Sequence, residues 1–293
     1  MTVAIDACMK KLPCIAIAFL FACGELSEEP VDDPGEVDAG SDVDVDADIA
    51  IDCGRGFGLS VDGVNPTRID LAAPTDALAL QTANFTIEMW AHLEDDDLAI
   101  ITNRGLDAAG AGNAGWSVHA STARVIFGFF RGSGHGHVTD LAEPLVPGWH
   151  HVAWTYEDGR SRIFVDGIAQ QATDCQLSAD FDGLDCLSPT GLLPSYSTAP
   201  AVLGTNRDGV GAHRTSFGAT YDELRVSSAV RYRSDFEPKE SHQPDAATIV
   251  LLDFDAGAGG VIRDSSGNGF DGVAAGGFDW LPSDGFGGRF CGE

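Results

Sequence analysis

Oxygen-bearing side chains in the last third of the sequence could bind a hard cation. Asp222, in the segment ATYDELRV, alternates with Leu224 and Val226, so it is predicted to face the core side of a strand. A carboxylate in such a place must be ion-paired, hydrogen-bonded or bound to a metal. Asp264 and Asn268, in the turn DSSGNG, carry oxygen ligands of the kind that calcium prefers. Alternatively, Asp222 caps backbone amides and Asp264 only shapes the turn.

Histidines offer a second possible metal site. His135 and His137, in RGSGHGHVTD, would face the same way in an extended segment, and Asp140 follows them. This gives two possible zinc ligands and a weak third. The surrounding glycines favour a loop with exposed imidazoles instead. His150 and His151, in WHHVA, are predicted to pack or to hydrogen-bond within a strand.

The cysteines indicate an oxidising compartment. Four of the seven, Cys53, Cys175, Cys186 and Cys291, lie beyond the first 52 residues and allow three disulfide pairings. Cys175 and Cys186 bracket a short acidic loop, whereas Cys53 and Cys291 lie at the two ends of the predicted folded region. We expect the pairs Cys53–Cys291 and Cys175–Cys186. No cysteine has the spacing of a zinc ligand pair.

The beginning of the chain has the pattern of an export signal. A basic start at residues 9–11 precedes an apolar run over residues 12–22, which is too short to span a bilayer as a helix. Leu20-Phe21-Ala22-Cys23 resembles the bacterial lipobox, in which the cysteine is acylated and becomes the mature N-terminus. Residues 1–22 are therefore predicted to be a lipoprotein signal peptide, with Cys23 as the lipidation site. Gly24 is not the aspartate that retains many lipoproteins at the inner membrane, so we expect an outer-membrane or cell-surface location.

Residues 23–52 are predicted to form a disordered acidic tether. Twelve acidic residues and no basic residue lie between Glu25 and Asp52, with almost no large apolar side chain. Such a segment cannot bury enough surface to offset its ordering entropy. The alternating aspartates at 42–48 lack the glycine and closing glutamate of a calcium loop. Residues 53–293 remain as one folded domain, with 32 acidic and 15 basic residues. This charge excludes nucleic acid as a partner and leaves the lipid as the only membrane contact.

Strand patterns dominate the folded domain. Apolar alternation, rich in β-branched and aromatic residues, marks 85–92, 124–130, 150–156 and 162–167. Asp158-Gly159 and Asp166-Gly167 are two-residue hairpin turns, which predict a three-stranded meander over residues 149–172. Further strands are predicted at 59–61, 68–71, 99–104, 116–120, 201–203, 221–226, 248–254 and 270–274. Glycine-rich connections are predicted at 105–115, 131–136 and 204–219, and a short helix near 228–235. The pattern indicates an all-β, two-sheet sandwich.

Several motifs resemble one family. FTIEMWAHL, GWHHVAWTYEDGRSRIFVDG, VLGTNR and YDELRVSSAVRYRSDFEP resemble the laminin-G-like jelly-roll family, which shares the fold of concanavalin A-like lectins and glucanases. LLDFDAGAGGVIRDSSGNGFDG is similar to a segment that often flanks such domains in bacterial surface proteins. The resemblance covers residues 53–290 and implies an antiparallel jelly-roll β-sandwich. It also implies a structural calcium ion, for which Asp222, Asp264 and Asn268 form a plausible partial shell.

Enzymes of this fold carry a motif that the chain lacks. The retaining glucanases of the superfamily have E-x-D-x-x-E on one strand, which places two glutamates at the spacing of a nucleophile and an acid. Glu88, in FTIEMW, has no second carboxylate two or four positions later, and residues 94–97 are typical of a polar turn. No Ser-His-Asp or Cys-His arrangement has a recognisable context. We therefore expect no catalysis; a divergent glycan hydrolase or lyase is the alternative.

Two functions remain. The first is a surface-tethered, non-catalytic binding module that recognises a glycan or a protein through loops at one rim of the sandwich. Its candidate ligand-binding residues are Trp116, Arg131, His135, Asn206, Arg207, His213 and Arg214. The second is a structural or adhesive surface lipoprotein without a small ligand.

Overall fold

The computed structural model describes residues 56–64, 66–81, 84–95, 97–131, 133–141, 143–171, 174–175, 186–187 and 195–282. The predicted signal peptide and tether, together with Cys23, Cys53 and Cys291, lie outside these residues. The described part contains strands, turns and bends but no helix, so no helix in it is long and apolar enough to cross a membrane.

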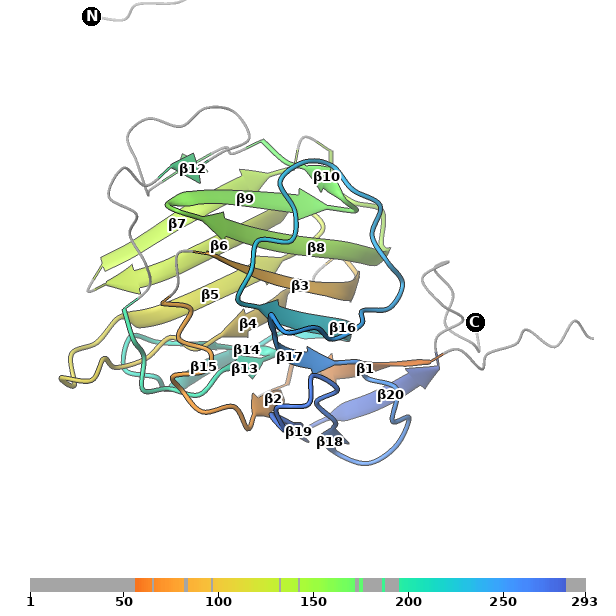
Figure 1. The fold of residues 1–293 in the computed structure, drawn as a ribbon. Helices are drawn as coiled ribbons and strands as arrows, with labels where there is room; N and C mark the ends of the chain where they lie inside the picture. Colours follow the sequence, from red (N-terminus) through yellow and green to blue (C-terminus); the bar gives the residue numbers. More distant parts are fainter. Residues whose placement is uncertain are drawn as a thin grey trace, which may run out of the picture. The chain divides into compact units, whose positions relative to one another are not determined.

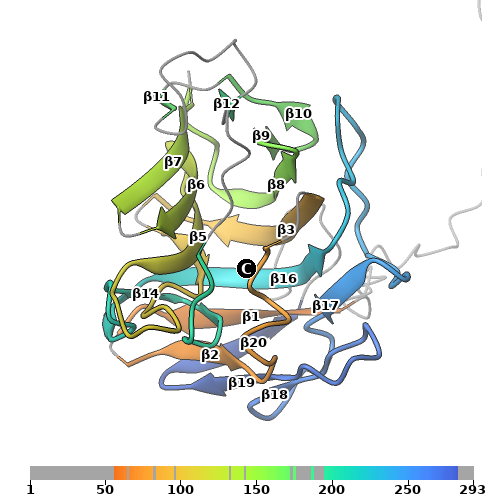
Figure 2. The same ribbon diagram turned by 60° about the vertical axis from the view of Figure 1, so that its left-hand side comes forward.

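Two large antiparallel sheets form the domain (Figures 1 and 2). The first sheet runs in the order β10 (Ile168–Ala169), β9 (Arg160–Val165), β8 (Gly148–Glu157), β3 (Asn84–Leu93), β16 (Gly218–Ser227), β1 (Phe57–Asp62) and β20 (Phe278–Pro282). In addition, β12 (Cys186–Leu187) pairs with β9, and β17 (Thr248–Leu252) pairs with β16. One edge of β16 is therefore shared by β1 and β17, while its other edge pairs with β3.

The second sheet faces the first. Its order is β11 (Asp174–Cys175), β7 (Ser133–Asp140), β6 (Arg124–Arg131), β5 (Ala114–Ala120), β4 (Ala99–Thr102), β13 (Val202–Leu203), β2 (Arg68–Leu71), β19 (Gly272–Ala275) and β18 (Val261–Ile262). A separate hairpin consists of β14 (Thr205–Arg207) and β15 (His213–Ser216). The predicted jelly-roll β-sandwich is confirmed.

The core lies between the two sheets. Because successive residues of a strand point to opposite faces, every second side chain can reach it. In β8 these are Val152, Trp154 and Tyr156, and in β5 they include Trp116 and Val118, all at most 1% exposed. The alternating apolar residues that identified the strands are thus the residues that the sandwich buries.

The predicted meander is present as β8, β9 and β10, joined by the two Asp-Gly turns. In both turns the aspartate and the glycine have positive φ: 46° and 94° at residues 158–159, and 49° and 77° at residues 166–167. Positive φ at both central positions matches the right-handed twist of the flanking strands, and Asp-Gly adopts it readily.

Three local predictions were wrong. Residues 228–235 form bends and irregular chain rather than a helix. In the glycine-rich segment 131–136, Arg131 belongs to β6 and residues 133–136 belong to β7, where Gly134 and Gly136 lie opposite Phe130 and Gly128. Residues 204–219 contain the hairpin β14–β15 and the start of β16. These strands contain glycine and polar residues that are typical of loops. They form because pairing with neighbouring strands outweighs the low strand propensity of these residues.

A β-bulge in β16 changes which side chains face outward. Asp222 pairs with Trp90 and Arg225 with Glu88, so Glu223 and Leu224 together lie opposite one residue of β3. Glu223 has a φ of 49°, which is unusual for a residue other than glycine. The extra residue breaks the alternation on which the prediction for Asp222 relied. Leu224 belongs to the core, whereas Asp222 lies on the outer side of the sheet with Trp90.

Candidate functional site

A long connection covers the outer face of the first sheet. Residues 228–247, here called the strap, leave β16 and return at β17, crossing β3 and β8 on the side away from the core (Figures 1 and 2, light blue). Thr86 donates its hydroxyl to the carbonyl of Ala229 at 2.8 Å, and Trp90 donates its indole N–H to that of Lys239 at 2.9 Å. Outward-facing side chains of β3, β8 and β16 are therefore buried by the strap.

The strap is also attached to the second Asp-Gly turn. The amide of Phe236 donates to the carbonyl of Gly167 at 2.9 Å, and Ala169 donates its amide to the carboxylate of Asp235 at 2.9 Å. A Cβ atom at residue 167 would lie 1.9 Å from the carbonyl oxygen of Phe236. Gly167 is therefore required both by its positive φ and by the close approach of the strap.

Aromatic rings hold the middle of the strap against the sheet. Tyr232 and Phe236 stack with their ring centroids 3.5 Å apart, and Phe164 of β9 meets both rings edge-on. Such aromatic contacts contribute beyond the area that they bury.

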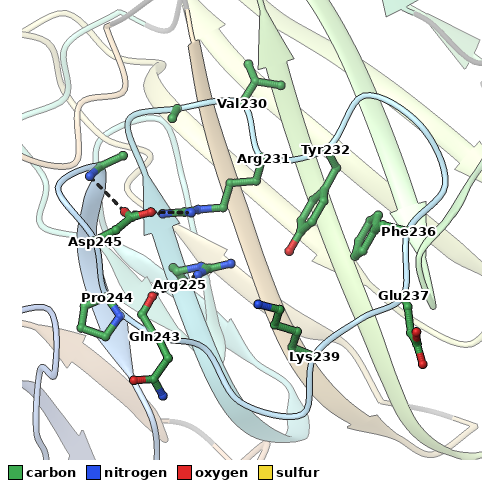
Figure 3. A pocket seen from close by; sticks show the side chains of 12 residues that line it. Arg225, Val230, Arg231, Tyr232, Phe236, Glu237, Lys239, Gln243, Pro244 and Asp245 are labelled. Atoms are coloured by element: carbon green, nitrogen blue, oxygen red, sulfur yellow. Dashed lines mark hydrogen bonds and ion pairs between the residues drawn. The ribbon is translucent and has the colours of Figure 1, made fainter.

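A pocket of about 520 Å³ opens between β16 and the strap (Figure 3). Arg225 of β16 and Lys239 of the strap lie on facing sides of it, with the ring of Tyr232 and the side chain of Gln243 nearby. The remaining lining residues are Ala229, Val230, Arg231, Phe236, Glu237, Pro244, Asp245 and Ala247. We call this space the strap pocket.

The charges of the strap pocket are only partly paired. Arg231 donates both terminal nitrogens to Asp245, at 3.0 and 2.8 Å, and these hydrogen bonds lower the pKa of that carboxyl. Arg225 donates its Nε to Glu88 at 2.8 Å. Within the described part of the chain, the exposed ammonium of Lys239 has no partner. The pocket can thus offer an ammonium, an amide and an aromatic edge to a polar ligand.

Glu88 lies beneath the pocket and is completely buried. Its Oε1 accepts the bond from Arg225, and its Oε2 accepts the hydroxyl of Tyr232 at 2.6 Å. The Nε2 atoms of His151 and His242 lie 3.5 and 3.6 Å from the same Oε2. Burial opposes ionisation of Glu88, but His151, His242 and Arg225 lower its pKa to about 2. Burial also opposes the charged form of His242 and lowers its pKa to about 4.

Sequence reasoning missed this group. Glu88 was assessed only as a catalytic carboxylate. His151 was assessed only as a residue that packs or hydrogen-bonds within a strand, and His242 lies far from both in the chain. The one available signal was a glutamate between apolar neighbours in FTIEMW, which marks a buried charge that needs a partner.

Carboxylates gather beside the bulge. Glu223, Asp253 and Asp255 line a second pocket of about 290 Å³, together with His242. Asp222 lies next to them and accepts the amide of Glu223 at 2.8 Å. We call these four residues the carboxylate cluster. Within the described residues, none of the four forms an ion pair with a basic side chain.

Burial and mutual repulsion raise the pKa values of three of these carboxyl groups. Burial and then the charges of Glu223, Asp255 and Asp253 raise the pKa of Asp222 well above its usual value. Burial raises the pKa of Glu223 to about 7, and Asp253 and Asp255 act in the same direction. The pKa of Asp255 is also raised, by burial and by Asp253. A divalent cation with oxygen ligands would relieve the repulsion among these carboxylates.

The structure gives Asp264 and Asn268 a different role. Asp264 accepts the amides of Leu251, Ser266 and Phe270 at 2.8–3.0 Å, and also the Ser266 hydroxyl. Asn268 donates its side-chain amide to the carbonyls of residues 248 and 249. These bonds hold the turn and use the acceptor capacity of Asp264. These bonds do not favour the predicted grouping of Asp264 and Asn268 with Asp222 around a metal ion, which stays a prediction.

Trp116 cannot serve as a ligand platform. It is 0% exposed in β5, and its indole N–H donates to the carbonyl of Leu78 at 2.7 Å. The prediction from the preceding glycine-rich loop was wrong because the strand begins within that loop, at Ala114.

Asn206, Arg207, His213 and Arg214 lie on the β14–β15 hairpin, and none of these four lines the strap pocket. Asn206 is half-buried, and Arg207 is 4% exposed, with its pKa lowered by burial. His213 and Arg214 are exposed, and Arg214 pairs with Asp208 at 2.5 Å. Arg131 and His135 lie in β6 and β7, but their side chains are outside the described part. A role of this hairpin in ligand binding stays a prediction.

The structure describes only the backbone of two cysteines. Cys175 pairs with His137 in β7, and Cys186 pairs with Ser161 in β9. Their side chains are outside the described part, so both predicted disulfides stay predictions.

Comparison with known proteins identifies the fold. The sequence profile of a laminin G-type family, described as the concanavalin A-like lectin/glucanases superfamily, matches residues 67–235. The match ends inside the strap, so residues 236–247 lie beyond it. A search of curated proteins found no match.

Three solved structures have a similar fold. The chain is 14% identical to a heptameric SAP-like pentraxin from Limulus polyphemus, covering 77% of this chain and 94% of that one, with a TM-score of 0.44. It is 13% identical to domains LG4-5 of the mouse laminin alpha1 chain, with a TM-score of 0.42. The match covers 64% of this chain and 49% of the laminin chain, so this chain spans about half the length of that structure. It is also 13% identical to the CBM40 of the Ruminococcus gnavus IT-sialidase bound to α2,3 sialyllactose, with a TM-score of 0.40 and coverage of 60% and 91%. These likenesses concern the fold alone.

The carboxylate cluster predicts an unusual pH dependence. Because the pKa of Glu223 rises from 4.5 to about 7 on folding, the folded state binds a proton that the unfolded state has released. Its contribution to the free energy of unfolding is therefore lost as pH rises through this interval. In chelator, the melting temperature of Glu223→Gln should exceed that of the native chain by an amount that grows by several degrees between about pH 5 and about pH 7.5.

The matched control is Glu237→Gln, at an exposed glutamate of the strap. Its difference from the native chain should stay constant with pH. If the difference in melting temperature between Glu223→Gln and the native chain also stays constant with pH, the raised pKa of Glu223 is contradicted.

Proposed function

Because the chain belongs to the concanavalin A-like lectin/glucanases superfamily, we propose that it is a non-catalytic binding module that takes a glycan in the strap pocket. The observation that carries this proposal is the pocket itself. It places the unpartnered ammonium of Lys239, the amide of Gln243 and the edge of Tyr232 around about 520 Å³. Sugar hydroxyl groups need such fixed polar partners beside an apolar surface.

Two carboxylates near the pocket, Asp245 and Glu88, are unsuited to acid catalysis. A glycosidase needs one carboxylic acid with a raised pKa and a second carboxylate at a defined separation. Asp245 is held by Arg231, which lowers its pKa, and Glu88 is buried with a pKa of about 2. Neither group is suited to donate a proton near neutral pH.

A glycan array followed by titration tests the pocket. We expect saturable binding of at least one glycan class by the full chain. Lys239→Met and Gln243→Ala should each weaken that binding about tenfold or more, because each removes a hydrogen bond to the ligand. Arg263→Met is the matched control, since Arg263 is an exposed cation that follows β18 and lies outside the pocket.

Other outcomes separate the alternatives. Unchanged affinity in Lys239→Met and Gln243→Ala, with binding lost on substitution of His213 or Arg214, would move the site to the β14–β15 hairpin. No glycan binding, with specific capture of a surface protein, would support the structural or adhesive lipoprotein. Turnover of any polysaccharide would refute the non-catalytic assignment.

The family resemblance and the carboxylate cluster together support a calcium ion held by Asp222, Glu223, Asp253 and Asp255. The ion would join β16 to the chain after β17 and neutralise charges that repel one another. At about pH 7.5, calcium should raise the melting temperature, and Asp253→Asn should reduce that rise. Asp264→Asn should retain it, because Asp264 bonds to the turn. An equal response to calcium in Asp253→Asn and the native chain would exclude the cluster as the site.

The sequence before the domain supports export and a lipid anchor at Cys23, with residues 23–52 as the tether. Cells fed a labelled fatty acid should incorporate label into the native chain, which should partition into detergent and sediment with outer membrane. Cys23→Ala should lose the label. Label retained in Cys23→Ala, or recovery of the native chain in the inner membrane, would contradict the anchor or the location, respectively.

A further inference from the structure

The buried group under the strap pocket has the composition of a metal site. Glu88 of β3, His151 of β8 and His242 of the strap place one carboxylate oxygen and two imidazole nitrogens within 4.8 Å of one another. Their side chains are 0%, 0% and 1% exposed. Three elements that are distant in the sequence therefore meet at one point, shielded from solvent.

The separations are too long for hydrogen bonds. Nε2 of His151 and Nε2 of His242 lie 3.5 and 3.6 Å from Oε2 of Glu88, whereas N–H···O bonds span about 2.7–3.2 Å. None of the four ring nitrogens of the two histidines has a hydrogen-bond partner within the described residues. Unpartnered polar atoms at this depth are costly, so they call for an occupant between them.

The same separations suit a shared transition metal. Zinc binds imidazole nitrogen at about 2.0–2.1 Å and carboxylate oxygen at about 2.0–2.2 Å, so tetrahedral ligand atoms lie roughly 3.4 Å apart. Two nitrogens and one oxygen are a borderline donor set, which favours zinc over calcium, since calcium takes six to eight oxygens. We propose that Glu88, His151 and His242 bind a zinc ion, with the fourth position open to water or a ligand group.

Neighbouring groups hold the carboxylate in position. Arg225 donates to Oε1 of Glu88 and the Tyr232 hydroxyl donates to Oε2, which leaves one lone pair of Oε2 for the metal. Two guanidinium groups nearby oppose a dication, but Arg231 is paired with Asp245, and Arg225 is paired with Glu88 itself. His242 also lines the acidic 290 Å³ pocket, which supplies an entry path of favourable charge.

Zinc at this point would join the strap to the sheet. His242 comes from the strap, whereas Glu88 and His151 come from neighbouring strands. The site is distinct from the proposed calcium site, which uses oxygen ligands only. It is also independent of the glycan proposal, because it needs no ligand in the strap pocket.

Metal binding by the full chain tests the proposal. The protein is stripped with a chelator, its thiols are alkylated, and calcium is supplied in excess so that cysteines and the carboxylate cluster do not bind zinc. We expect one zinc ion per chain by elemental analysis, with a rise in melting temperature. His242→Gln and His151→Gln should each bind zinc at least about tenfold more weakly in competition with a chromogenic chelator.

His150→Gln is the matched control, because His150 neighbours His151 but bonds to Asp166 and to the carbonyl of Val146. It should bind zinc as the native chain does. Unchanged zinc affinity in both His151→Gln and His242→Gln, or no zinc bound by the native chain, would overturn the proposal. If a variant fails to fold, Co²⁺ is added to the metal-free native chain in place of zinc and the visible absorption spectrum is measured. Absorption typical of tetrahedral Co²⁺ with nitrogen and oxygen ligands supports the site, and its absence refutes it.

Discussion

The buried charge of Glu88 is the constraint around which the outer face of the first sheet is organised. A carboxylate cannot lose its water without ion pairs and hydrogen bonds that replace it. The replacements come from β16 through Arg225, and from the strap through the hydroxyl of Tyr232. Glu88 can therefore be buried only when the strap packs over the sheet. The bonds of Tyr232 to Glu88 and of Trp90 to Lys239 fix the strap relative to the sheet, and the strap pocket lies between the two.

One extra residue in β16 sets the second feature of this face. The bulge at Glu223 and Leu224 lets Leu224 return to the core while Asp222 stays outside. The positive φ of Glu223 is a strained conformation that the surrounding pairing must maintain. Its result is that two successive carboxylates lie near Asp253 and Asp255, where like charges raise the pKa of Asp222 and Glu223 beyond the effect of burial.

One strap residue, His242, contacts both the carboxylate cluster and Glu88. Glu223 of the carboxylate cluster accepts the backbone amide of His242 at 2.7 Å, while the His242 side chain reaches Glu88. A metal ion bound at either group would therefore act on the strap, which also forms a wall of the strap pocket. Part of this wall, residues 236–247, lies beyond the region that matches the family. Ligand preference in this chain would then depend on a segment that the shared fold does not specify.

The sequence alone determined the sandwich, its strongest strands and the meander. Alternating apolar residues and Asp-Gly turns act over a few residues, so they can be read locally. The sequence did not determine the partners of Glu88, the face of Asp222 or the burial of Trp116. Each of these depends on which strands become neighbours, on a bulge, or on a strap folding back over many residues. Only the tertiary structure decided them, because a buried charge is satisfied by groups that are close in space and distant along the chain.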